Sequence, residues 1–143
     1  MSFVDTNVLV YSTASTAPFR DAARNALVRF GVNESLAITR QVLREYIAVM
    51  TREQAWDRPL TLAEAREDVT QFMRRFAILE NSPDVWDRLM DLSRTHGFSG
   101  RQVHDANIVA TMPAHGERRI LTFNASDFRR FADLIEIASL SGP

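Results

Sequence analysis

The 143-residue sequence contains no cysteine and no lysine, and each absence excludes a class of chemistry. Without cysteine, the chain has neither a disulfide framework nor a thiolate metal site. Without lysine, every mechanism that depends on a catalytic lysine is excluded, and all 17 basic residues are arginine. Genome composition is the simplest reason for this bias, but arginine is also well suited to bidentate contacts with phosphate.

Long apolar runs and a basic N-terminal segment are also missing. No run reaches the roughly 18 apolar residues that a membrane-spanning helix needs, and "MSFVDTN" does not have the features of a signal peptide. Hydrophobic residues make up 45% of the chain and charged residues 24%, with a net charge of −1. We therefore expect one domain over residues 1–143, located in the cytoplasm and not in a membrane.

Strand-like and helical segments alternate along the chain. Short apolar segments predict strands at 2–5, 35–39, 77–80, 119–123 and 135–138. Apolar residues at helical spacing predict a short helix from Asn7, a helical turn at 126–132, and helices at 18–31, 40–53, 61–76, 83–97 and 101–116. This alternation predicts an α/β domain of three layers, α/β/α, with a central and mostly parallel sheet of four to five strands.

Two of the predicted helices begin with clear signals. Thr61 and Glu64 form a capping-box pattern, and Ser82 precedes a proline at the first helical position. The aromatic side chains of this region are at helical spacing, so we expect Phe76 and Trp86 in the core. Its acidic residues, such as Asp68, are expected on the outer, solvated faces of the helices.

Two predicted strands are followed by acidic or amide side chains. Asp5 interrupts the apolar segment "SFVDTNVLVY", where an unpaired carboxylate is costly. Asn124 and Asp127 follow the strand "RILTF". Parallel sheets of this kind bind ligands at the carboxyl ends of their strands. We therefore expect Asp5 at the rim of a binding site, although Asn124 and Asp127 are also common turn and cap residues.

Two further carboxylates lie on largely apolar helices. Asp105 falls in the first turn of the predicted helix at 101–116, where the helix dipole favours an anion. A helix-capping role is the alternative for this residue. Glu45 lies at the margin of the apolar face of the helix at 40–53, and a surface glutamate with a buried stem is the alternative there.

Considered together, these oxygen ligands would meet at one edge of the sheet. Such a set suits a hard divalent cation, Mg²⁺ or Mn²⁺. Carboxylates so close to one another would repel strongly unless a cation were present. From spacing alone, a metal site and a set of unrelated caps and polar contacts remain equally open.

The same segments resemble the motifs of the PIN-domain ribonucleases. "FVDTNVLVY" is similar to their opening motif, and "QVLREYIAVM" is similar to their second acidic motif. "RQVHDANIVATMPAHGERRILTFNASDFRRF" resembles the third and fourth motifs in order and spacing. The resemblance spans essentially the whole chain, which at this length resembles a VapC-type toxin of a bacterial toxin–antitoxin pair.

The resemblance implies a role for each motif residue. It implies catalysis by the acidic cluster, whose members would be Asp5, Glu45, Asp105 and Asp127. It also implies that metal ligation falls to Asp5, Glu45 and Asp105, with Asn124 as a further candidate. Whether Asn124 or Asp127 is the fourth site residue stays open, and so does the choice between one metal and two. Thr6, Asn7 and Thr122 would support the cluster.

The activity implied by the resemblance is metal-dependent hydrolysis of an RNA phosphodiester bond. Mg²⁺ or Mn²⁺ would polarise the scissile phosphate and lower the pKa of a bound water. An arginine rim would hold the RNA backbone, and the candidates are Arg40, Arg44, Arg101 and Arg118. The implied partners are RNA, a cognate antitoxin protein and a second copy of the chain in a homodimer.

Other functions compete with this one. Phosphoacceptor receiver modules and haloacid-dehalogenase-type phosphatases also place acidic residues at strand ends, but both normally use a lysine, which this chain lacks. A PIN domain that binds RNA or protein without catalysis is the more serious alternative. Loss of metal-dependent RNA cleavage on Asp5→Ala substitution would separate the enzyme from that alternative.

Overall fold

The computed structural model describes residues 1–54, 57–112 and 118–140. Its elements in chain order are β1 (Ser2–Val4), α1 (Thr6–Thr13), α2 (Arg20–Gly31), β2 (Leu36–Thr39), α3 (Arg40–Met50), α4 (Leu62–Arg75), β3 (Ala77–Leu79), α5 (Pro83–Thr95), α6 (Gln102–Thr111), β4 (Arg119–Thr122), the 3₁₀ helices η1 (Ala125–Asp127) and η2 (Arg129–Phe131), and β5 (Glu136–Ser139). The predicted alternation of strands and helices is confirmed.

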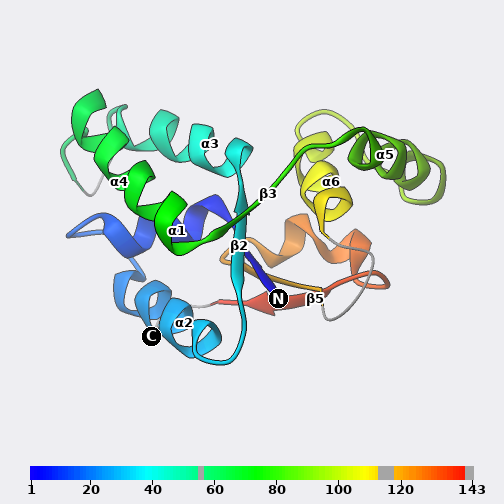
Figure 1. Cartoon of the computed structure of the whole chain (residues 1–143), viewed down its shortest axis with the longest axis horizontal. Coiled ribbons are helices and arrows are strands. Elements are labelled where there is room, and N and C mark those ends of the chain that lie inside the picture. Colours follow the sequence, from blue (N-terminus) through cyan, green and yellow to red (C-terminus); the bar gives the residue numbers. More distant parts are fainter. Residues whose placement is uncertain (55–56, 113–117, 141–143) are drawn as a thin grey trace.

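The five strands form one parallel sheet in the order β3-β2-β1-β4-β5. β1 lies at its centre, where Phe3 is in register with Ala37 of β2 on one side and Ile120 of β4 on the other. In Figure 1, α1 to α4 lie on the left of β2, and α5 and α6 lie on its right. The predicted three-layer α/β/α fold is therefore confirmed.

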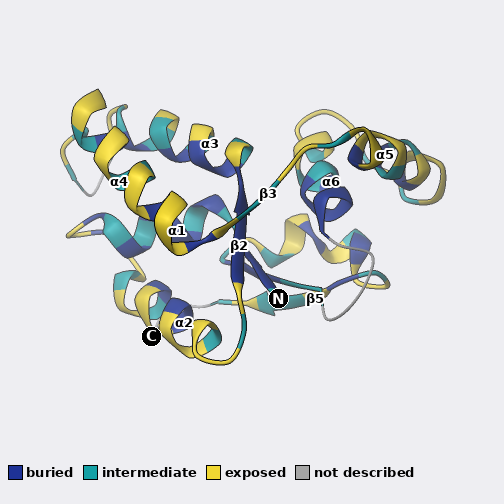
Figure 2. Ribbon diagram, viewed as in Figure 1, coloured by how far each residue is buried: buried dark blue, intermediate teal, exposed yellow. Residues whose placement is uncertain are grey.

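The inner strands are buried on both sides. Every residue of β1 and β2 is buried, and so are Ile120, Leu121 and Thr122 of β4. Figure 2 shows the same division in the helices, whose inner faces are buried and whose outer faces are exposed. Apolar side chains leave no room for a charge within these strands, so the acidic residues fall just beyond the strand ends.

Helix boundaries differ from the predictions by a few residues. α2 begins at Arg20 because Phe19 adopts a left-handed conformation, with a φ of 60°, that a helix does not continue. α3 ends at Met50 and α6 ends at Thr111, both earlier than predicted. The predicted break at Pro113 lies outside the described residues. In the described chain, no helix is both long enough and apolar enough to cross a membrane.

Packing confirms some side-chain predictions and contradicts others. Phe76 is buried, and the capping box at the start of α4 is present. Trp86 is 61% exposed, so its predicted place in the core is wrong. Asp68 is also not an ordinary surface residue, because its carboxylate accepts a 2.6 Å hydrogen bond from the hydroxyl of the buried Tyr46. Ser82 precedes α5 as its N-cap, but its side chain makes no capping hydrogen bond.

Candidate active site

Asp5 occupies the junction between β1 and α1 at the carboxyl edge of the sheet. Its backbone N–H continues the strand pairing to the Leu121 carbonyl at 3.1 Å, and the residue is then the N-cap of α1. One carboxylate oxygen, Oδ1, accepts a hydrogen bond from the Thr6 N–H at 2.8 Å. The other, Oδ2, accepts from the Thr122 hydroxyl at 2.8 Å and from Asn7 Nδ2 at 3.2 Å. All of these donors are neutral.

The environment of Asp5 favours its protonated form. Burial is the largest cause, and it raises the pKa of the Asp5 carboxyl to about 6. The hydrogen bonds from Thr122 and Thr6 oppose this rise, and the negative charges of Glu45 and Asp127 add to it. Glu45 on α3 and Asp127 on η1 therefore lie close enough to Asp5 for their charges to affect its pKa.

Asn7 and Thr122 connect the ends of β1 and β4. Thr122 is fully buried at the end of β4, and its hydroxyl also accepts hydrogen bonds from the Asn124 N–H at 2.9 Å and from Asn7 Nδ2 at 3.4 Å. The Asn7 side-chain carbonyl accepts a hydrogen bond from the Phe123 N–H at 3.1 Å. These contacts fix the position of Asp5 relative to the neighbouring strand.

Glu45 is tied to α1 by a hydrogen bond across the site. The Thr6 hydroxyl donates to Glu45 Oε2 at 2.8 Å, and Gln41 Nε2 donates to Oε1 at 2.9 Å. Glu45 therefore faces the same edge as Asp5 and does not extend into solvent as a free side chain. Thr6 supports both carboxylates, one through its N–H and the other through its hydroxyl.

Asp105 enters the site from the first turn of α6. Its pKa is raised to about 7, chiefly by burial and then by the negative charges of Asp127, Asp5 and Glu45, while the positive charge of Arg130 lowers it. No hydrogen bond to its side chain is found in the described part of the chain. The four acidic residues thus lie within electrostatic range of one another, although they come from four different elements.

Asp127 and Asn124 lie close together in sequence but take different positions. Asp127 ends η1, is exposed, and is the residue of the two whose charge acts on Asp5 and Asp105. Asn124 is also exposed, and its backbone N–H binds the Thr122 hydroxyl. Asp127 therefore acts on the cluster through its charge, whereas Asn124 contacts the site through a hydrogen bond from its backbone N–H.

The cluster has the donor chemistry of a divalent-cation site but not its closed geometry. Among the residues that the structure describes, no arginine or histidine forms an ion pair with any of the four carboxylates. In that same part of the chain, no group of three or more His, Asp or Glu side chains has a geometry that could hold a metal ion. Metal binding would therefore require side-chain rotation. Asp105 and Asp127 are the freest to turn, because neither side chain is held by a hydrogen bond among the described residues.

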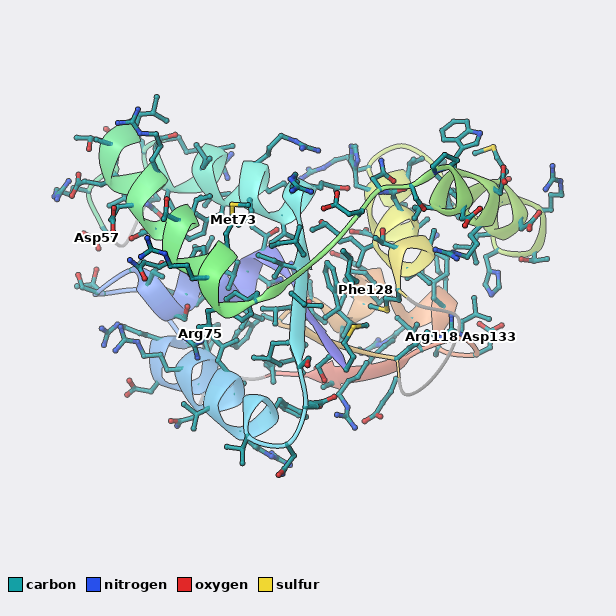
Figure 3. All side chains as sticks on the ribbon, viewed as in Figure 1. Asp57, Met73, Arg75, Arg118, Phe128 and Asp133 are labelled. Carbon is teal, nitrogen blue, oxygen red and sulfur yellow. The ribbon has the colours of Figure 1, made fainter. Side chains whose placement is uncertain are left out.

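The four arginines predicted to form the RNA-binding rim differ in their distance from the cluster and in their contacts. Arg44 on α3 and Arg101 at the start of α6 are exposed on elements that carry the cluster. Arg40 is also exposed but forms an ion pair with Glu80, just after β3. Arg118, which is labelled in Figure 3, immediately precedes β4 and so lies at the amino end of this parallel strand, whereas the carboxylates lie beyond the carboxyl ends of the strands. The structure does not bring Arg118 to the cluster.

Two further residues, Gln41 and Arg130, have clear roles at the site, and the sequence-based predictions overlooked Gln41. Gln41 holds Glu45 from one helical turn earlier, and their i,i+4 spacing on α3 is a signal that could have indicated this. Arg130 follows η1, donates hydrogen bonds to the Gly97 carbonyl at 2.6 Å and to Gln102 Oε1 at 3.0 Å, and lowers the pKa of Asp105. Nothing in the sequence distinguishes Arg130 from the adjacent Arg129.

Comparison with known proteins finds a matching family model and two similar ribonucleases. A family model described as the PIN domain matches residues 2–134. The chain is 32% identical over 133 residues to "Ribonuclease VapC24" of Mycobacterium tuberculosis, covering 92% of this chain and 91% of that protein. It is 30% identical over 130 residues to "Ribonuclease VapC48" of the same organism, covering 89% of each.

Solved structures share the fold. VapBC2 from Rickettsia felis, bound to a DNA fragment from its promoter, matches with a TM-score of 0.70 and 19% identity over 98% of each chain. A toxin–antitoxin complex from Klebsiella pneumoniae matches with a TM-score of 0.65 and 21% identity, covering 90% of this chain and 91% of that one. At these identities the likeness is one of fold.

Proposed function

Because this chain belongs to the PIN-domain family, we propose that it is a metal-dependent endoribonuclease and the toxin of a toxin–antitoxin pair. The two curated relatives named as ribonucleases support the activity, since the chain matches about nine-tenths of each. The toxin–antitoxin complexes among the structural neighbours support the biological role. The substrate is RNA, and the bond that is hydrolysed is a phosphodiester.

The observation that carries this proposal is the gathering of Asp5, Glu45, Asp105 and Asp127 at one edge of the sheet. Burial, and after it the negative charges of neighbouring carboxylates, raises the pKa values of Asp5 and Asp105, and no arginine forms an ion pair with the four in the described chain. A divalent cation, Mg²⁺ or Mn²⁺, is the charge that this arrangement lacks. When bound, it supplies Lewis-acid polarisation of the phosphate and a water of lowered pKa.

The residues of the chain orient the carboxylates. Thr6, Thr122 and Asn7 hold Asp5 through short hydrogen bonds, and Thr6 and Gln41 hold Glu45. These two acids are preorganised, which lowers the cost of arranging them around a ligand. Asp105 and Asp127 would complete the site by rotating towards them, and Asn124 is the alternative fourth ligand.

Substrate and partner contacts complete the proposal. Arg44 and Arg101 are exposed on the two helices that carry Glu45 and Asp105, so they are placed to contact the phosphates of an RNA strand beside the cluster. Arg40 could join them by exchanging its contact with Glu80 for a phosphate. We further propose that the protein is cytoplasmic, forms a homodimer and is inhibited by a cognate antitoxin protein.

RNA cleavage by the purified protein tests the proposed activity. We expect cleavage with Mg²⁺ or Mn²⁺, none in EDTA, and a loss of at least about 100-fold for Asp5→Asn. The matched control is Asp87→Asn, which changes an exposed acid on α5 and should leave the rate unchanged. Undiminished cleavage by Asp5→Asn would contradict the assignment. RNA binding without cleavage by the unaltered protein would favour the non-catalytic alternative.

A further inference from the structure

A pocket lies between α5 and α6, beside the connection from β3 to α5. Its volume is about 420 Å³, within the range of small-molecule sites. Trp86 on α5 and Val103 on α6 line it and are 61% and 39% exposed. A ligand that covers an indole this exposed would gain the stabilisation that comes from removing its apolar surface from water.

The pocket also has polar groups at its border. Asn81, Ser82, His104 and Asn107 line it, and in the described part of the chain no hydrogen bond is found for any of these four side chains. Ser82 shows this most clearly, because it occupies the N-cap of α5 without capping the helix through its hydroxyl. The pocket therefore combines an aromatic face with several available donors and acceptors.

The pocket and the acidic cluster share α6. His104 lies next to Asp105 in the first turn of this helix, and Asn107 lies two residues further on. Even groups on opposite sides of one helix are separated by no more than its diameter, about 10–12 Å with side chains. A strand whose phosphate lies at Asp105 can therefore reach the pocket with a nearby nucleotide.

We propose that this pocket binds a nucleobase of single-stranded RNA, with Trp86 as the stacking surface and Asn81, Ser82, His104 and Asn107 as contacts to the edge of the base. The proposal rests on the proposed ribonuclease function and extends it to the choice of cleavage site. Base-specific recognition of RNA uses this combination of an aromatic face and hydrogen bonds to the base edge.

A nucleobase satisfies the pocket better than an apolar protein side chain does. An apolar side chain would cover Trp86 but would leave four polar side chains without partners at a dehydrated surface, which is costly. None of the residues lining the pocket is acidic, so the pocket itself does not repel the phosphates attached to a base. The occupant is thus a group with both a π face and polar edges.

Tryptophan fluorescence tests this binding without requiring cleavage. The chain has two tryptophans, so a Trp56→Phe background leaves Trp86 as the sole tryptophan, which excitation at the red edge of the absorption band selects over the tyrosines. We expect a short single-stranded RNA of mixed sequence, added in EDTA, to quench this emission through stacking. The same strand with abasic sites should quench it much less. No quenching by either strand would overturn the proposal.

Substitutions then test the role of the side chain. In anisotropy measurements with labelled RNA, Trp86→Ala should weaken binding about tenfold, whereas Trp86→Phe, which keeps an aromatic face, should weaken it by no more than about threefold. Leu62→Ala is the matched control, because Leu62 on α4 is 60% exposed and does not line this pocket. Ser82→Ala and Asn107→Leu should change which base is preferred beside the cleaved bond.

The remaining outcomes separate this proposal from the proposed function. RNA cleavage that is unaffected by Trp86→Ala, in rate and in site preference, would overturn the base pocket and leave the ribonuclease assignment intact. RNA binding through Trp86 without any cleavage would support the base pocket and contradict the ribonuclease assignment. If Trp86→Ala lowers the mass measured by light scattering and leaves RNA affinity unchanged, the surface contacts a second copy of the chain and the proposal is wrong.

Discussion

The hydroxyl of Thr6 donates a hydrogen bond to Glu45 Oε2 at 2.8 Å, although the two residues are 39 positions apart. Through its backbone N–H, the same threonine also binds Asp5. Thr6 thus sets the relative position of α1 and α3 at the edge of the sheet, and two of the four clustered carboxylates depend on it.

Thr6→Val tests this link, because valine keeps the shape of the side chain and removes the hydroxyl. Glu45 would lose one of its two hydrogen-bond donors, so we expect the free energy of unfolding to fall by about 1–2 kcal/mol and RNA cleavage to slow. Urea denaturation and cleavage rates measure the two effects. Thr70→Val is the control, since that exposed hydroxyl bonds only to the Arg66 carbonyl of its own helix. Equal effects of the two substitutions would contradict the role given to Thr6.

The raised pKa values of Asp5 and Asp105 predict how stability in EDTA depends on pH. The folded protein holds protons on these groups, with pKa values of about 6 and about 7, that the unfolded chain has already released at about pH 4. Stability therefore falls as the pH rises from about 4 to about 7. Asp105→Asn should raise the free energy of unfolding by about 1–2 kcal/mol at about pH 8 and change it little at about pH 4.

Denaturation of the two proteins at several pH values measures this difference. Asp91→Asn serves as the control, because Asp91 is an exposed acid that pairs only with Arg94 on the same helix. A lower melting temperature of Asp105→Asn in EDTA would instead show that Asp105 stabilises the start of α6 as a capping residue.

Divalent cations should stabilise the protein through the same carboxylates. A cation present at about 100 times its dissociation constant adds about 2.7 kcal/mol to the free energy of unfolding. We expect Mg²⁺ or Mn²⁺ to raise the melting temperature of the unaltered protein, and to raise that of Asp5→Asn much less. Thermal melts with increasing cation measure the effect. A rise of the same size in both proteins would place cation binding elsewhere.

Tyr46 joins three helices through its hydroxyl. It donates to Asp68 Oδ2 on α4 at 2.6 Å and also lies 3.0 Å from Thr13 Oγ1 on α1. Burial and the adjacent Asp68 carboxylate raise the pKa of the tyrosine above its usual range, so the hydroxyl keeps its proton at neutral pH. Tyr46→Phe should lower the free energy of unfolding by about 1–3 kcal/mol, with little change in RNA cleavage by the folded protein.

Chemical denaturation and cleavage rates measure these two consequences. Glu67→Gln is the control, because Glu67 is an exposed neighbour on α4 whose recorded partner is Gln71 of the same helix. A Tyr46→Phe protein as stable as the unaltered one would show that water replaces the hydroxyl at no cost.

Sequence periodicity predicted the fold because buried strands and amphipathic helices leave strong local patterns. It also indicated that Asp5 lies at a strand end, since a carboxylate is not tolerated within a buried strand. It could not predict that Trp86 is exposed or that Asp68 accepts a hydrogen bond from Tyr46. Both depend on how α4 and α5 are rotated against their neighbours, which helical spacing constrains only loosely. Arg118 is close in sequence to Asn124 and Asp127 but lies at the other end of β4, so its position depends on the direction of that strand.

The pairing of β1 with β4 has a consequence for the newly synthesised chain. Asp5 leaves the ribosome 117 residues before Thr122, whose hydroxyl holds its carboxylate. The central strand therefore has no neighbour on its β4 side until β4 has also been synthesised. A nascent or truncated chain that lacks β4 and η1 cannot assemble the carboxylate cluster, so this cluster forms only after both segments have been synthesised.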